Sequence, residues 1–182
     1  MEELPADFKS LLEQSGMVFG MPENFTPVAA KGNDSVLYHH AVAAPPPGKL
    51  ELRYQLVAPA APPPGGFKLT AAAEPGAVRQ AMLLSVIMNI AARVIAPPSP
   101  FPEEAVRGEF AADWGAVCRV ELKPSAFAEG FRECMILALH RGGSAAYVFM
   151  LYDNFERSGD LLESSFYTLK FAAAPPRADA GS

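Results

Sequence analysis

An alternation of apolar and polar side chains marks residues 49–57 as a strand. Its apolar members stand at every second position: Leu50, Leu52, Tyr54 and Leu56. Successive side chains of a strand point to opposite faces, so this set is expected in the core, with Glu51 and Arg53 toward water or under a thin cover. Residues 36–43 precede it across a Pro-Pro-Pro-Gly turn. The two segments are predicted to form an antiparallel hairpin.

The longest apolar segment, residues 77–95, has a helical pattern. Its polar residues Ser85, Asn89 and Arg93 recur every four positions, and nearly all its other side chains are apolar. A helix so widely apolar needs cover on more than one side. The predicted sheet covers one side, and a second helix or a second subunit would cover another. The segment falls short of the roughly 20 apolar residues that span a bilayer, so no membrane span is expected.

The same periodicities predict the other elements. Helices are expected over residues 4–15, 102–114 and 160–171, and strands over 17–21, 117–123, 131–140 and 145–152. The last two strands are apolar on both faces and should form the centre of the sheet. This order predicts one α+β domain over residues 1–174, an antiparallel β-sheet with helices packed on both faces. The proline-rich segment 58–66 is expected to be a surface loop, and 175–182 a flexible C-terminal tail.

Composition and charge narrow the class of protein. Half of the 182 residues are hydrophobic and 19% are charged, which is typical of a globular protein and not of a disordered chain. The net charge is −5 and Lys and Arg do not cluster, so we expect no nucleic-acid partner. The N-terminus carries acids where a secretory signal needs basic residues, which favours a cytoplasmic protein.

The sequence carries no recognisable catalytic or metal-binding motif. His39 and His40 would point to opposite faces of a strand, and no further ligand stands at metal-binding spacing to them or to His140. We therefore expect no metal and no cofactor, and name no catalytic residue; enzymatic activity is left open. Cys118 and Cys134 are the only cysteines and are expected to be reduced and buried.

Four residues are candidates for a binding surface. Trp114, the only tryptophan, stands with Phe110 on one face of the predicted helix 102–114. The pair is either a core anchor at the helix end or an exposed binding anchor. Leu84 and Met88 lie four residues apart on the long apolar helix. They are the expected contacts of a homodimer, because an uncovered apolar patch most often pairs with a symmetry-related copy.

The order of elements resembles the Mog1/PsbP-like fold. Within it, the chain is most similar in pattern to bacterial members to which no specific function is attached. The resemblance spans roughly residues 17–171. It rests on Met21-Pro22-Glu23-Asn24-Phe25 after the first strand, the paired strands near the end and a closing helix that ends Ser-Ser-Phe-Tyr-Thr-Leu-Lys-Phe. The long helix 77–95 and the loop before it depart from the pattern. Members of this fold bind a small GTPase, support a photosystem or chaperone apolar segments of secreted effectors, so the resemblance implies non-catalytic binding and assigns no functional residue.

Two functions fit these observations. The first is a non-catalytic protein-binding or chaperone-like module that acts through an apolar surface, with a protein partner or a second copy of itself. The alternative is a small-molecule-binding protein or weak enzyme with a pocket between helix and sheet, in which Tyr54, Arg93 or His140 would make polar contacts. An open apolar face favours the first, and a closed pocket with convergent polar groups favours the second.

Overall fold

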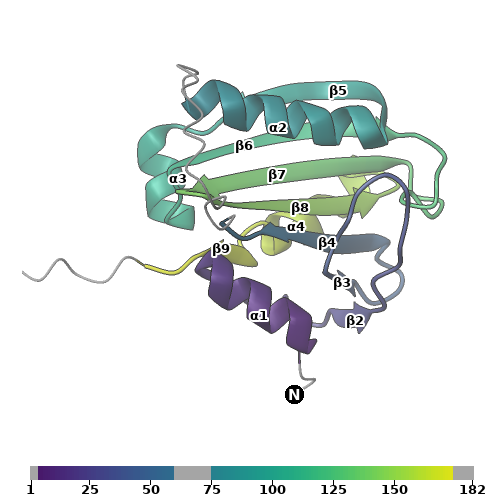
Figure 1. Ribbon diagram of the computed structural model, residues 1–182. Helices are drawn as coiled ribbons and strands as arrows, with labels where there is room; N and C mark the ends of the chain where they lie inside the picture. Colours follow the sequence, from purple (N-terminus) through teal and green to yellow (C-terminus); the bar gives the residue numbers. More distant parts are fainter. Residues whose placement is uncertain (1–3, 60–74, 174–182) are drawn as a thin grey trace, which may run out of the picture.

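A large antiparallel sheet organises the computed structural model, which describes residues 4–59 and 75–173 (Figure 1). The strand order is β2-β3-β4-β8-β7-β6-β5, and β1 pairs with β9 in a separate two-stranded sheet. Along the chain the elements are α1 (Ala6–Ser15), β1 (Met17–Phe19), β2 (Thr26–Val28), β3 (His40–Ala43), β4 (Leu50–Val57), α2 (Pro75–Ile90), β5 (Ala91–Pro100), α3 (Glu103–Phe110), β6 (Trp114–Leu122), β7 (Glu133–Arg141), β8 (Ser144–Tyr152), α4 (Phe155–Ser165) and β9 (Leu169–Phe171). The predicted α+β class with an antiparallel sheet is confirmed.

The hairpin β7–β8 forms the centre of the sheet, as its two apolar faces predict. Its register runs from Glu133 opposite Tyr152 to Arg141 opposite Ser144. Every residue of β8 is buried. The predicted hairpin of the first half is also present, since β3 pairs antiparallel with β4, and β4 lies against β8 along its whole length. Of the predicted strand 36–43, only His40–Ala43 forms β3.

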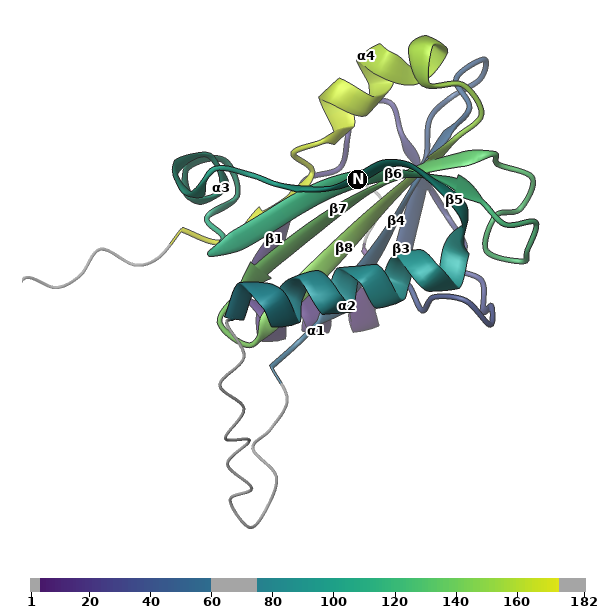
Figure 2. The ribbon, with the colours of Figure 1, turned by 90° about the horizontal axis from the view of Figure 1, so that it is seen from above.

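Two hydrophobic cores lie on the two faces of the sheet. Alternate residues of β8 enter different cores, so Val148 and Met150 define one face, here the α4 face, and Tyr147 and Phe149 define the other, the α2 face. Buried side chains of α1, α3 and α4 belong to the core of the α4 face, whereas those of α2 belong to the core of the α2 face. Figure 2 shows α2 and α4 on opposite sides of the sheet.

The long apolar segment forms a helix and a strand, so the prediction of one helix over 77–95 is wrong. Helix α2 ends at Ile90, whose carbonyl accepts a hydrogen bond from the backbone N–H of Lys123 at 2.9 Å, and the Lys123 ammonium donates to the Met88 carbonyl at 2.7 Å. Residues 91–100 then pair with β6 as an edge strand. An edge strand tolerates its prolines, and β-branched Val94 and Ile95 favour a strand.

The helix expected over 102–114 is also shorter. Helix α3 ends at Phe110, and Ala111 follows in the left-handed conformation with φ 48°. Trp114 begins β6, and Gly115 lies inside this strand instead of capping a helix. A Cβ at Gly115 would lie 2.9 Å from Cγ2 of Val106, so the glycine allows α3 to approach the sheet closely.

Substitution of Gly115 by alanine is expected to lower the free energy of unfolding by about 1–3 kcal/mol, because the added methyl group overpacks the contact between α3 and β6. The matched change is Gly32→Ala, since a Cβ at the exposed Gly32 meets no atom within 4 Å. This control should change stability by less than about 0.5 kcal/mol. Urea unfolding of both variants measures the difference, and equal stabilities would contradict the assigned role of Gly115.

The C-terminal helix begins and ends earlier than the predicted range 160–171. Helix α4 begins at Phe155, after Asn154, whose side-chain oxygen accepts a hydrogen bond from the backbone N–H of Arg157 at 3.0 Å. Ser158 therefore does not cap it. Residues 169–171 form β9, which pairs with β1 from Met17 opposite Phe171. The pairing of the chain's first and last described strands is a long-range contact that no local pattern indicates.

The first helix and the two cysteines agree with the predictions from the sequence. The first helix, expected over 4–15, is α1, which is followed by Gly16 in the left-handed conformation. Cys118 and Cys134 are buried and free, as predicted. In the described part of the chain, no helix has the length and hydropathy needed to cross a membrane. Residues 60–66 of the expected proline-rich loop and the expected tail 175–182 lie outside the described residues.

Candidate binding surface

Helix α2 divides its side chains between the core and the exterior. Leu83, Ile87 and Ile90 are buried in the core of the α2 face. The side chains that remain exposed include four large apolar ones, Val78, Met82, Leu84 and Met88. Leu84 is 44% exposed and Met88 is 74% exposed, so both predicted interface residues lie open on this helix. The exposed side of α2 is thus largely apolar, with the uncharged polar residues Gln80, Ser85 and Asn89 among its exposed side chains.

The exposed side of α2 is also uncharged. Arg79 is the only charged residue between positions 76 and 92. Its side chain is only 20% exposed, and its guanidinium lies 4.0 Å from the Asp113 carboxylate. A helix face that points to water normally carries charged residues. Their absence here distinguishes α2 from the other helices of the protein.

Strand β5 lies next to α2 (Figure 1). It is the last strand in the order of the sheet, so its outer edge has no strand partner among the described residues. Val94 and Ile95 are exposed on it. Prolines at 97, 98 and 100 remove backbone donors from the second half, which leaves residues 91–96 as the part of the edge able to pair. We call the exposed set the α2–β5 surface: Val78, Met82, Leu84, Met88, Val94 and Ile95.

The structure separates the predicted pair Phe110 and Trp114. Phe110 is buried on the α4 face, with its ring 5.9 Å from that of Phe166 and 5.3 Å from that of Tyr167. Trp114 packs on the α2 face, where its ring centroid lies 5.3 Å from that of His140. Phe110 is the last residue of α3 and Trp114 is the first residue of β6, and the two side chains pack in different cores. They do not share one exposed surface.

The three polar residues proposed for a pocket also lie apart. Tyr54 is fully buried on the α4 face, where its hydroxyl lies 2.9 Å from Oγ1 of Thr168 and burial raises its pKa. Arg93 is exposed on β5 and pairs with Glu121 at 2.7 Å. His140 is buried on the α2 face, and this burial lowers its pKa to about 4. These three side chains do not converge on one site.

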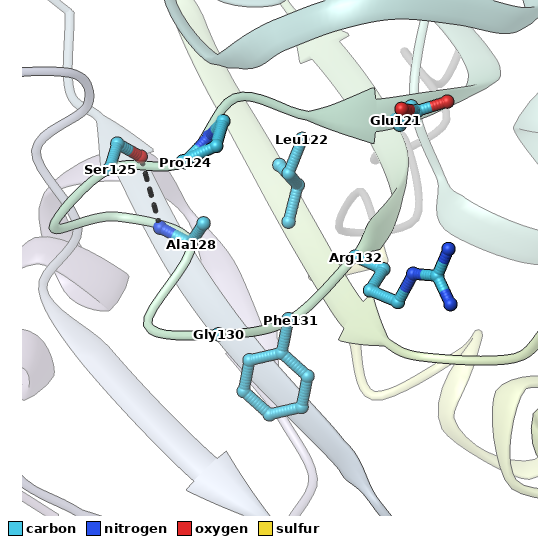
Figure 3. Close-up of a pocket in the computed structure, with 8 residues that line it drawn as sticks. All are labelled: Glu121, Leu122, Pro124, Ser125, Ala128, Gly130, Phe131 and Arg132. Atoms are coloured by element: carbon cyan, nitrogen blue, oxygen red, sulfur yellow. Dashed lines mark hydrogen bonds between the residues drawn. The ribbon is translucent and has the colours of Figure 1, made fainter.

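A cavity of 470 Å³ lies beside the connection between β6 and β7 (Figure 3). Its lining mixes apolar and polar side chains, including Leu122, Phe131 and Arg132. The Ser125 hydroxyl accepts a hydrogen bond from the Ala128 N–H at 3.2 Å, and Glu121 is engaged by Arg93. Ser125 and Glu121 are thus already used within the protein, which leaves Arg132 as the charged side chain of the lining. The cavity offers little convergent chemistry to a ligand.

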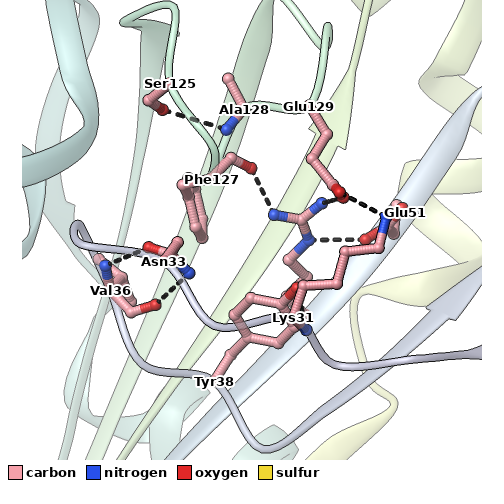
Figure 4. Close-up of polar contacts among 10 residues, drawn as sticks. Lys31, Asn33, Val36, Tyr38, Glu51, Ser125, Phe127, Ala128 and Glu129 are labelled. Carbon is pink, nitrogen blue, oxygen red and sulfur yellow. Dashed lines mark hydrogen bonds and ion pairs between the residues drawn. The ribbon is translucent and has the colours of Figure 1, made fainter.

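A buried ionic cluster is the feature that sequence reasoning missed (Figure 4). Arg53 is 0% exposed, whereas its place in the alternating strand β4 predicted a face turned to water or thinly covered. Its guanidinium donates to the Glu51 carboxylate at 2.6 Å, to the Glu129 carboxylate at 2.6 Å and to the Phe127 carbonyl. Of the two environments that the sequence left open for this polar face, water or a thin cover, the structure shows a cover formed by residues distant in the sequence.

The covering residues come from two loops. The Arg53 guanidinium lies 4.9 Å from the ring centroid of Tyr38 and 5.1 Å from that of Phe127. Lys31 donates to Glu129 at 2.6 Å, and this bond is the main reason why the pKa of Glu129 is lowered. Arg53 thus anchors residues 29–39 and 123–132 over the α2 face. Since the protein supplies its partners, the cluster is a structural anchor. The sequence carried no clear signal for it, because Arg53 is one of the ordinary polar positions of the alternating strand.

Comparison of the sequence with protein-family models and with curated proteins found no match. In the part of the chain that the structure describes, no three His, Cys, Asp or Glu side chains lie together as metal ligands would. The class that fold and surface define is therefore an α+β protein with an antiparallel sheet and an exposed, largely apolar surface on α2.

Proposed function

We propose that the protein is a non-catalytic protein-binding or chaperone-like module and that the α2–β5 surface contacts its partner. The observation that carries this proposal is the apolar, uncharged side of α2 beside an open sheet edge. Each 100 Å² of apolar surface removed from water contributes about 2.5 kcal/mol before the costs of association. A partner that covers Leu84 and Met88 gains part of this free energy, and the one charged side chain of α2, Arg79, is only 20% exposed.

A second copy of the chain is the partner that we propose first. Oligomers of soluble proteins are most often symmetric dimers, in which the same patch contacts itself. Leu84 and Met88 are four positions apart on one helix, so they can meet the same residues of an antiparallel α2 from another copy. The exposed backbone edge of residues 91–96 offers a further contact, because edge strands readily pair with other chains.

The parent protein is expected to form a dimer at micromolar concentration, and Leu84→Glu is expected to raise its dissociation constant at least about tenfold, since a charge would be buried at the contact. Leu37→Glu is the matched control, because Leu37 is also an exposed leucine, 66% exposed in the loop before β3, and does not belong to the α2–β5 surface. Light scattering across a dilution series measures both. A Leu37→Glu variant that dissociates as readily would contradict the assignment to α2.

A partner other than a second copy is tested by an apolar dye. The parent protein should enhance the fluorescence of bis-ANS, and Leu84→Glu should reduce the amount bound, whereas Leu37→Glu should not. A monomeric parent protein whose dye binding is unaffected by Leu84→Glu would contradict the proposed function. A monomer whose dye binding falls would exclude the second copy and retain a different protein as partner.

The relationship to the Mog1/PsbP-like fold and the cytoplasmic location are part of the same proposal. The antiparallel sheet with helices on its two faces supports the first. Binding through an apolar surface is also what that resemblance implies. The alternative function is a small-molecule-binding protein or weak enzyme with a pocket between helix and sheet. A cavity beside α4, in a different region of the protein, favours this alternative.

A further inference from the structure

A cavity of 320 Å³ is lined by residues of helix α4 and by Met135 of strand β7. Helix α4 lies on the face of the sheet opposite to α2 (Figure 2). This volume falls in the range of small-molecule sites. Six of its lining residues are apolar or aromatic and one is acidic: Met135, Phe155, Gly159, Leu162, Phe166, Tyr167 and Glu163. The polar residues considered from the sequence are not among them. The cavity is therefore independent of the α2–β5 surface.

The aromatic walls of this cavity are held in place by neighbouring side chains. Phe166 and Tyr167 contact each other edge-on at 5.4 Å, and both contact the buried ring of Phe110. Phe155 carries the Arg119 guanidinium 3.6 Å from its ring centroid, and Arg119 is in turn bound by Glu133 at 3.2 Å. One face of Phe155 is therefore already in a cation–π contact, which fixes the ring at the edge of the cavity.

Gly159 opens the cavity at the cost of helix stability. It stands inside α4, where glycine is less favourable than alanine. Packing does not require it, because a Cβ at this position would meet no atom within 4 Å, and its φ lies outside the left-handed region. A side chain here would stabilise the helix and enter the cavity that Gly159 lines. The glycine therefore keeps this part of the cavity open.

The rim of the cavity is acidic on one side. Glu163 lines the cavity, and Glu156 and Asp160 precede it by seven and three positions, which places all three on one side of α4. Among the described residues, none of the three carboxylates has an ion-pair partner. Their unbalanced negative charge attracts a positively charged ligand and repels an anion.

We propose that this cavity binds a small organic cation, a substituted ammonium whose apolar body fills the space between α4 and β7. The faces of the aromatic rings and the Glu163 carboxylate stabilise its charge, while Met135 and Leu162 contact its carbon skeleton. Aromatic residues with a nearby acid recognise quaternary ammonium groups by this combination of forces. The proposal goes beyond protein binding through α2 and does not depend on it.

The test uses benzyltrimethylammonium as the probe, with uncharged benzyl alcohol and anionic benzenesulfonate as comparison ligands. In a nuclear magnetic resonance titration of the full-length protein, the cation should bind at least about tenfold more tightly than the alcohol, and the sulfonate least. Glu163→Gln should reduce the preference for the cation over the alcohol about threefold or more, because it removes the charge but retains the shape. Equal affinities of the three ligands would overturn the proposal.

Glycine variants locate the site. Gly159→Leu should fill the cavity and reduce affinity for the cation at least about tenfold, whereas Gly108→Leu should leave it unchanged. Gly108 is the matched position, since it also lies in a helix, α3, with no atom within 4 Å of an added Cβ. Circular dichroism confirms that both variants fold. Undiminished binding by a folded Gly159→Leu variant would overturn the proposal. Leu84→Glu, which tests the protein-binding surface, should not affect the cation.

Discussion

Replacing Arg53 with methionine is expected to lower the free energy of unfolding by about 3 kcal/mol or more. The guanidinium is wholly buried and donates to two carboxylates and one carbonyl. Methionine fills a similar space but leaves Glu51 and the Phe127 carbonyl without their donor. Breaking a buried pair on one side is costly, because the remaining charge stays desolvated. Urea unfolding followed by circular dichroism measures the loss.

The control for this prediction is Arg93→Met. Arg93 forms a similar ion pair, 2.7 Å from Glu121, but its side chain is 71% exposed. Water screens such a pair, so its removal should change stability by less than about 1 kcal/mol. Arg53→Lys should lie between the two, since an ammonium retains the charge but cannot match the planar contacts with three acceptors and two rings. Equal effects of Arg53→Met and Arg93→Met would contradict the anchoring role.

The parts of the fold that the sequence predicts well are those in which local pattern and tertiary environment agree. Strand β4 has a clean alternation, and the hairpin β7–β8 has apolar residues on both faces, so each has one arrangement that buries them. The segment 77–95 is different. Its apolar residues suit either a helix or a strand, and only pairing with β6 determines that the helix ends at Ile90. A single sequence does not reveal that partner.

Only part of the candidate binding surface could be predicted from the sequence, because residue spacing is local information. Leu84 and Met88 were selected by helical spacing, and they lie in the portion of the segment that is a helix. Trp114 and Phe110 were paired by the same spacing, but β6 already begins at Trp114, and the two side chains enter opposite cores. Local spacing also gave no sign that Arg53 meets Glu129, 76 positions further along the chain. Such contacts depend on the folded chain.

Acid is expected to destabilise the protein through His140. The residue is buried, and this burial, with a smaller contribution from the positive charge of Arg79, lowers its pKa from 6.5 to about 4. The Tyr147 hydroxyl lies 3.4 Å from Nε2 of His140, and the rings of Trp114 and His140 are edge-on to each other. The Asp113 carboxylate lies 4.0 Å from Arg79, and the pKa of His140 is lowered nevertheless. Between pH 6.5 and about 4 the unfolded state therefore binds a proton that the folded state does not.

The free energy of unfolding should consequently fall as the pH is lowered from 6.5, with a total loss from His140 of about 3 kcal/mol by pH 4. His39 and His40 also have lowered pKa values and add to the slope of the parent protein, so the comparison must be with His140→Gln. Glutamine keeps a polar atom near the Tyr147 hydroxyl but does not titrate. Urea unfolding at pH 7.5, 5.5 and 4.5 should show a shallower pH dependence for the variant. If parent and variant lost stability in parallel, His140 would have to be exposed to water or paired with an acid, and the buried contact with Trp114 would be contradicted.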